Sequence, residues 1–320
     1  MLLTPRAARV NPVRAKNFQH DGKPRPGADL PAARRRAQAP GMKPARTPAP
    51  DAAAPPVVRV GCCGFAGAQA AYFRDFPVVE VQQTFYEPPA PETVARWRER
   101  APPDFEFTLK AWQLITHPPG SPTYRRLRQP LPAEWHDQVG AFRPSDAVWV
   151  AWERTREIAR VLRARVVVFQ CPASFAPTPE HLENLRRFFR RVRADLEKRR
   201  EPAPRLAWEP RGAWPDAVIE ALCRELDLVH VVDPWVRPPV TPDPFYFRLH
   251  GLGGYGHRYT DAELRWLRAR VGDFPAGGWC LFNNVTMRED AARFLELLRG
   301  GRAAPRAAAG RKRGKEEMPG

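Results

Sequence analysis

The sequence predicts a (β/α)8 barrel of the TIM type, an α/β fold flanked by two basic tails. Three observations point to it. Eight short runs rich in β-branched or aromatic residues alternate with helical stretches, as in parallel α/β sheets. Helices fill most of the gaps between these runs, which fits a closed barrel better than an open doubly wound sheet. No G-x-G-x-x-G sequence follows the first run, which disfavours the open sheet further.

The expected elements can be placed in order along the chain. Strands are expected at residues 57–61, 78–84, 105–111, 166–170, 206–211, 229–233, 245–250 and 279–284. Helices are expected at residues 91–100, 145–163, 179–198, 215–226, 261–271 and 288–299. Ser145 and Thr178 are expected to cap two of these helices, because a hydroxyl accepts a hydrogen bond from the first turn.

Two connections are irregular. Residues 234–244 contain five prolines, so no helix is expected between the sixth and seventh strands. Residues 112–144 form a long segment rich in Pro, Arg and aromatic residues after the third strand. Long structureless connections in compact domains are either functional lids or disordered segments. In a barrel this one is expected to lie over the C-terminal mouth, where active sites form.

The most informative pattern is an alternation of apolar and polar residues within two strands. One side of the third strand carries Phe105, Phe107 and Leu109. The other side carries Glu106, Thr108 and Lys110. The seventh strand repeats the pattern, with Arg248 and His250 on its polar side. Charges inside a closed sheet are costly unless they are paired, so they usually serve a site.

If the strands close into a barrel, the polar positions converge at its mouth. The candidate catalytic residues are Lys110, Glu209, His250 and His117. The candidate substrate-binding residues are Glu80, Gln82, Thr84, Gln170, Arg211, Asp233, Arg248, Tyr255, Asn283 and Asn284. Glu106 and Thr108 are also expected to face this space. A purely structural ion-pair network is the alternative interpretation, above all for Glu106 and Arg248.

Lys110 has a further argument in its favour. The chain holds 45 Arg and only seven Lys, and Lys110 and Lys198 are the only lysines between the tails. A desolvated lysine can lose its proton, whereas an arginine practically cannot. A lysine kept at this position could therefore serve as a nucleophile, a proton donor or an anion-binding charge.

A metal centre has weaker support. Glu80, Glu209, Asp233 and His250 could hold a divalent metal, since carboxylates and histidine are adequate ligands. No spacing motif supports such a site, so no cofactor is predicted. The five cysteines include no C-x-x-C pair, which argues against a zinc cluster or a disulfide framework.

The positive charge is concentrated at the two ends of the chain. Of the net charge of +17, residues 1–54 carry +8 and residues 300–320 carry +4, which leaves +5 for the predicted barrel domain, 55–299. Both tails are rich in Ala, Pro and Arg without apolar periodicity, so we expect them to be disordered. They could give salt-sensitive contact with nucleic acid, or have no fixed partner. With no membrane-spanning run and no apolar signal segment, the expected location is the cytoplasm.

Seven ordered motifs at the expected strand ends resemble the DUF72 (YecE-like) family. They are GCCGF at 61–65, VEVQQTFYEPP at 79–89, FEFTLKAWQLITH at 105–117, QCPASF at 170–175, WEPRGAW at 208–214, FRLHG at 247–251 and FNN at 282–284. The resemblance runs through essentially all of residues 57–299. It implies a TIM-type barrel but no particular reaction. The GCCGF motif stands where GTSGW or GCSGW is frequent in the family. Cys62 and Cys63 are therefore poor candidates for an obligatory catalytic thiol.

The first functional hypothesis is an enzyme that acts on a small polar or anionic substrate, such as a sugar or nucleotide phosphate. Lys110 would be the acid, base or nucleophile, Arg211 and Arg248 would hold the anion, and Glu209 and His250 would transfer protons. The alternatives are a barrel that binds nucleic acid through its tails and loop arginines, and a metabolite-binding module without catalysis.

Overall fold

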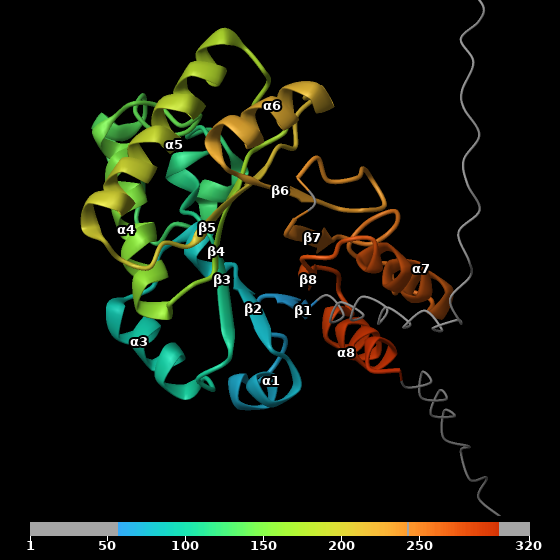
Figure 1. The fold of residues 1–320 in the computed structure, drawn as a ribbon. Helices are drawn as coiled ribbons and strands as arrows, with labels where there is room; N and C mark the ends of the chain where they lie inside the picture. The colour runs from blue at the N-terminus through green and yellow to red at the C-terminus, as the bar shows by residue number, and fades with distance from the viewer. Residues whose placement is uncertain (1–56, 242, 301–320) are drawn as a thin grey trace, which may run out of the picture. The chain divides into compact units, whose positions relative to one another are not determined.

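The computed structural model describes residues 57–241 and 243–300. Apart from Gly300, the predicted disordered tails, residues 1–54 and 300–320, lie outside these residues. Eight parallel strands close into one barrel in sequence order, with β1 paired to β8 (Figure 1). The strands are β1 (Val58–Cys63), β2 (Val78–Val81), β3 (Glu106–Lys110), β4 (Val166–Gln170), β5 (Arg205–Glu209), β6 (Val229–Val232), β7 (Phe245–Leu249) and β8 (Gly278–Phe282). The predicted barrel is confirmed.

Helices surround the strands, with α4 and α5 on one side and α7 and α8 on the other (Figure 1). The helices are α1 (Gln69–Asp75), α2 (Gln83–Tyr86), α3 (Pro91–Arg100), α4 (Asp146–Leu162), α5 (Pro179–Arg199), α6 (Asp216–Leu226), α7 (Asp261–Gly272) and α8 (Met287–Leu298). All six predicted helices are present. Ser145 and Thr178 cap α4 and α5 as expected, and no helix occurs between β6 and β7 in the described residues.

The predicted second strand is too long. Strand β2 ends at Val81, and residues 83–86 form α2, a single helical turn. The Thr84 hydroxyl bonds to the carbonyl oxygens of Val81, at 3.0 Å, and Lys110, at 2.7 Å. These bonds fix the turn, which buries Phe85. Gln82 and Thr84 therefore lie beyond the strand rather than on it.

Residues 112–144 form the predicted long loop after the third strand, with no α-helix or strand among them. This segment contains three short 3-10 helices, η1 (Gln113–Ile115), η2 (Pro122–Arg126) and η3 (Ala133–Trp135). Leu114, Ile115 and Phe142 are completely buried in the main hydrophobic core. The segment is thus tied to the barrel by its own apolar side chains.

The alternation within the strands separates two cores. Phe107, Leu109 and Phe169 belong to the outer core between the strands and the helices. The inner core fills the barrel itself and consists of Cys63, Val78, Val166, Val168, Ala207, Val229, Val231, Tyr246, Trp279 and Leu281. The predicted inward direction of the polar positions is confirmed, because Thr108 on β3 bonds across the barrel to Tyr246 on β7. Nothing among the helices of the described residues has the length and apolarity needed to cross a membrane.

Candidate functional site at the barrel mouth

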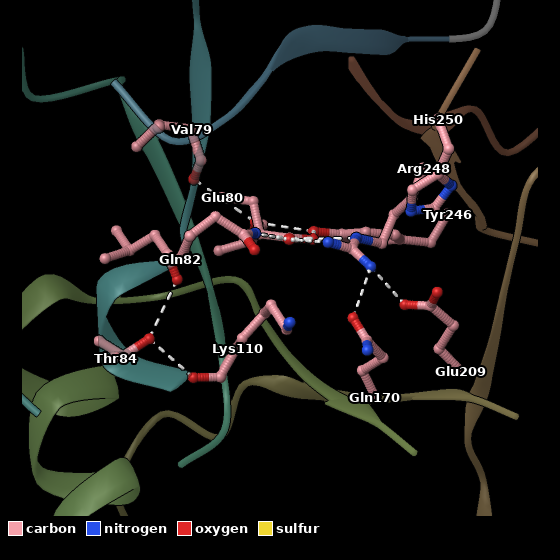
Figure 2. Close-up of polar contacts among 12 residues, drawn as sticks. Val79, Glu80, Gln82, Thr84, Lys110, Gln170, Glu209, Tyr246, Arg248 and His250 are labelled. Carbon is pink, nitrogen blue, oxygen red and sulfur yellow. Dashed lines mark hydrogen bonds and ion pairs between the residues drawn. The ribbon is translucent and has the colours of Figure 1, made fainter. Parts of the chain in front are cut away.

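Polar side chains from five strands meet at the C-terminal end of the barrel (Figure 2). They are Glu80 on β2, Lys110 on β3, Gln170 on β4, Glu209 on β5 and Arg248 on β7. Gln170 and Glu209 stand side by side in the pairing register of β4 and β5. These five residues, which we call the mouth cluster, were all predicted from the sequence.

Arg248 is the centre of the mouth cluster. Its Nε donates to Glu80 Oε1 at 3.1 Å, and its Nη1 donates to Glu209 Oε2 at 2.5 Å and to Gln170 Oε1 at 3.1 Å. The Arg248 side chain is only 1% exposed and that of Glu80 is fully buried. Burial alone would lower the pKa of Arg248, but the carboxylates of Glu209 and Glu80 hold it well above its ordinary value. This guanidinium is therefore permanently charged and fixed in place.

Beneath Arg248, Glu80 is bound from two further directions. The Tyr246 hydroxyl donates to Glu80 Oε2 at 2.7 Å and lies 2.8 Å from the Thr108 hydroxyl. The Gln82 amide also donates to Glu80 Oε1. Tyr246 was not among the predicted site residues. The signal for it was its position two residues before Arg248 on the same polar side of a strand.

A second chain of contacts runs from Glu209 toward the solvent. Arg211 Nε donates to Glu209 Oε1 at 2.8 Å, and Arg211 Nη2 lies 2.9 Å from His250 Nε2. The backbone N–H of His250 donates to Asp233 Oδ2 at 3.0 Å. Because Arg211 can only donate, His250 Nε2 accepts and its proton lies on Nδ1, which faces Asp233 at 3.5 Å. The Arg211 side chain is 34% exposed and that of His250 is 20% exposed, so this part of the site is open to solutes.

Lys110 differs from every other charged group of the mouth cluster. Its amine lies 3.8 Å from the centre of the Phe85 ring and, within the described residues, makes no hydrogen bond or ion pair. Burial, reinforced by the positive charge of Arg248, lowers the pKa of Lys110 from 10.5 to about 7. In Figure 2 its side chain points toward the same space as Gln170 and Glu209. Near neutral pH, this amine is available as a base or nucleophile.

His117 joins the site from the segment after β3. Its ring contacts the Phe85 ring at 4.9 Å, so Phe85 lies against both His117 and Lys110. Its Nδ1 lies 2.8 Å from the Thr116 hydroxyl. Burial, together with the positive charge of Lys110, lowers the pKa of His117 to about 3. His117 is thus neutral at physiological pH. Sequence reasoning missed Phe85 because it follows the predicted strand, 78–84, and the α2 turn that brings its ring to Lys110 was not predicted.

Several predicted site residues have other contacts. The Asn284 amide donates to the His257 carbonyl and to Asp290 Oδ2, both at 2.7 Å, and so ties the β8–α8 connection together. Asn283 bonds through its backbone N–H to the Leu249 carbonyl. Tyr255 is half exposed, and its ring lies 5.7 Å from that of His250 at the rim. The Thr84 hydroxyl is used by the backbone bonds described above.

Glu106 lies at the wrong end of the barrel for the mouth. It is the first residue of β3, and it pairs with Arg59 at 3.1 Å and Arg165 at 3.7 Å. Trp279 Nε1 also donates to it at 2.9 Å. The expectation that Glu106 faces the mouth is therefore wrong, and its interpretation as part of a structural ion-pair network is favoured.

A metal centre has no support in the described residues, where no group of three or more His, Cys, Asp or Glu side chains is arranged to hold an ion. Glu80 and Glu209 pair with Arg248 instead. Nor is a reactive thiol evident beside the cluster, because burial, followed by the charge of Glu80, raises the pKa of Cys63 well above its ordinary value.

Comparison with known proteins places this geometry in a family. The model of the family described as "Protein of unknown function DUF72" matches residues 68–313. No match was found to any curated protein. A DUF72 family protein from Enterococcus faecalis superposes with a TM-score of 0.57 at 19% identity, over 76% of this chain and 97% of that one. One from Thermotoga maritima gives 0.53 at 20% identity, over 76% and 99%.

A more distant similarity extends to a xylose isomerase domain protein from Planctomyces limnophilus. Its TM-score is 0.48 at 13% identity, over 77% of this chain and 96% of that one. The similarity to the two DUF72 proteins shows a shared barrel and nothing about the reaction.

Proposed function

The chain belongs to the DUF72 family, and we propose that it is an enzyme that transfers protons on a small polar or anionic substrate at the mouth of its barrel. The substrate class that fits is a sugar phosphate, a nucleotide or a compound of similar charge. The observation that carries the proposal is the Lys110 amine, which is buried, pairs with no carboxylate of residues 57–241 and 243–300, and has a pKa of about 7. Such a lysine is a poor structural element, because a buried charge is normally paired.

A pKa near 7 suits a general base or general acid, because both protonation states are populated at working pH. The neutral amine could also attack a carbonyl carbon of the substrate, which would form an imine with loss of one water molecule. Both roles use the same atom, Lys110 Nζ.

The other residues of the site take supporting roles in this proposal. Arg211 and His250 lie at the open side and would bind the anionic group of the substrate. Burial opposes the charge of Glu209, but the neighbouring Arg248 and Arg211 lower its pKa to about 2. We therefore assign Glu209 the role of holding both guanidinium groups rather than of transferring protons. His117 would act as a neutral hydrogen-bonding group.

The first test is a thermal-shift screen of the full chain against sugar phosphates, nucleotides and short oligonucleotides, followed by turnover assays on the compounds that bind. A compound that binds only the native state raises its apparent stability. Lys110→Met should lower kcat by about 10²–10⁴-fold, the usual range for loss of a general acid or base. Lys198→Met, at the other lysine of the barrel domain, is the matched control and should leave kcat unchanged.

The pH dependence and a chemical trap refine this test. If Lys110 is the base or nucleophile, kcat/KM should rise as the pH increases through about 7. Borohydride would trap an imine but leave a simple proton transfer unaffected. Full turnover by the Lys110→Met variant would contradict the proposal.

Two alternatives from the sequence remain as outcomes of the screen. Binding of oligonucleotides alone, with strong salt sensitivity, would favour a nucleic-acid-binding barrel. Binding of a small molecule that is never chemically changed would favour a non-catalytic module. For the compartment, we propose the cytoplasm, since all five cysteines are free and buried and a reducing compartment keeps thiols in that state.

A further inference from the structure

A cavity of about 950 Å³ lies at the N-terminal end of the barrel, opposite the mouth cluster. We call it the basal cavity. Its walls are formed where seven of the eight strands begin, together with the C-terminal ends of α4 and α6. The volume lies in the range of small-molecule sites, which are about 300–1,000 Å³.

The lining of the basal cavity is strongly basic. Six arginines and two acidic residues contribute to it, and one of these arginines, Arg160, pairs with Glu157 outside the lining. They are Arg59, Arg160, Arg163, Arg165, Arg193 and Arg205, with Glu106 and Asp227.

Some of these arginines have clear structural partners. Arg59 and Arg165 pair with Glu106. Arg193 pairs with Asp227 at 2.9 Å and donates to the Leu226 carbonyl at 3.1 Å, where it satisfies the C-terminal end of α6. These contacts use both acidic groups of the lining and need no ligand to explain them.

Arg163 and Arg205 have no such partners. Both are exposed, and neither side chain makes a hydrogen bond or ion pair to any residue that the structure describes. Arg163 ends α4 with a φ of 51°, a left-handed conformation that glycine usually adopts. Arg205 is the first residue of β5. The two unpaired guanidinium groups thus come from separate elements and line one cavity.

We propose that the basal cavity binds a small multivalent anion of the phosphate type. Guanidinium groups match the geometry of phosphate oxygens and form charge-assisted hydrogen bonds with them. The arginines gather around one half-open cavity at the base of the barrel, which favours a small anion over an extended nucleic-acid strand. Trp279 and Val229, which also line the cavity, offer apolar contact to an organic part of the ligand.

Calorimetry on the full chain tests this proposal, with inorganic tripolyphosphate and adenosine triphosphate as probes at near-physiological salt. The expected result is one saturable binding event at the basal cavity, in addition to any binding of nucleotide at the mouth. Arg163→Gln/Arg205→Gln should weaken it about tenfold or more, because each lost charge-assisted hydrogen bond is substantial. One control should bind as the unaltered chain does: Arg265→Gln/Arg268→Gln makes the same charge change on the exposed face of α7.

The two probes distinguish the sources of the phosphate group. Equal affinity would identify the triphosphate as the recognised group, and tighter binding of the nucleotide would add a contact to its nucleoside. If neither probe binds, the proposal is overturned. The proposal is also overturned if the Arg163→Gln/Arg205→Gln variant binds the probes with unchanged affinity, which would assign the anion to another part of the chain. The Arg205→Gln single variant provides the same comparison if the double variant unfolds at a lower temperature.

Discussion

Lys110 and Arg248 are two cations buried at the same end of the barrel, but they are held in different states of charge. Arg248 lies between the carboxylates of Glu80 and Glu209, which keep it charged. Lys110 contacts the Phe85 ring, and burial lowers its pKa to about 7. Arginine could not replace lysine here, because its guanidinium practically never loses its proton. This difference gives a physical reason for a lysine in so arginine-rich a chain.

The lowered pKa predicts a stability change that does not depend on any substrate. Between pH 7 and 10.5 the unfolded chain binds more protons at Lys110 than the folded chain does, so the free energy of unfolding rises with pH in that window. Burying the charged amine costs about 1.4 kcal/mol of stability per unit of pKa shift, and Lys110→Met removes this cost. The variant should be more stable than the unaltered chain by a few kcal/mol below pH 7, with a gain that shrinks toward pH 10.

Urea unfolding at one pH below 7 and one near 10 measures this effect. The difference in stability between Lys198→Met and the unaltered chain should be the same at both pH values, because Lys198 is exposed at the end of α5. A stability difference between Lys110→Met and the unaltered chain that is the same at both pH values would contradict a lowered pKa at this position.

At the scale of elements, the sequence predicted which way a side chain points but not its height in the barrel. Alternation places Glu106, Thr108 and Lys110 on the inner side of β3. Height depends on the stagger between neighbouring strands, which pairs Glu80 with Thr108 and Val78 with Glu106. Glu106 therefore lies one layer below Thr108, near the base. No local pattern contains that information.

The short helix α2 shows the same limit. Its turn is fixed partly by the bond from Thr84 to the Lys110 carbonyl, and these residues are 26 positions apart in the chain. Local propensity favoured a continued strand, and a tertiary contact overrode it. The mouth cluster was predictable from strand ends and alternation, whereas Phe85 depends on this turn and was missed.

Helix α1 fastens β1 to β2 through a single hydroxyl. Tyr72 Oη accepts a bond from the Cys62 N–H at 2.7 Å and donates to the Val78 carbonyl at 2.9 Å. Gly61 permits this close approach, because a Cβ there would lie 2.0 Å from the Val78 carbonyl oxygen.

Tyr72→Phe should lower the free energy of unfolding by about 1–3 kcal/mol, because it leaves a buried N–H and a buried carbonyl without their partner. Chemical denaturation followed by circular dichroism measures the loss. Tyr86→Phe is the matched control, since no hydrogen bond to the Tyr86 hydroxyl occurs in the described residues. Equal losses of unfolding free energy in the two variants would show that the hydrogen bonds of the Tyr72 hydroxyl do not stabilise the fold.

For the whole molecule, three buried groups contribute to the response to acid. Burial lowers the pKa of His117 to about 3 and that of His230 to about 4, so the fold keeps both rings neutral. The pKa of Glu209 is lowered to about 2: burial opposes its charge, but Arg248 and Arg211 outweigh it. In each case the unfolded chain takes up protons at a higher pH than the folded chain does.

The free energy of unfolding should therefore fall as the pH drops below about 6.5, where unfolded histidines titrate, and fall again below about 4.5, where an unfolded glutamate does. Urea unfolding from pH 7 to pH 4 measures the first stage. His117→Gln/His230→Gln should flatten the curve in that range. A curve as steep in this variant as in the unaltered chain would assign acid sensitivity to other groups.

The pairing of β1 with β8 has a consequence for association. An open sheet presents a row of unpaired N–H and carbonyl groups at each edge, which another chain can extend by adding a strand. The barrel of this protein is closed and has no such edge. Whatever binds the barrel, including a second copy of it, must be recognised by side chains and loops rather than by continuation of its sheet.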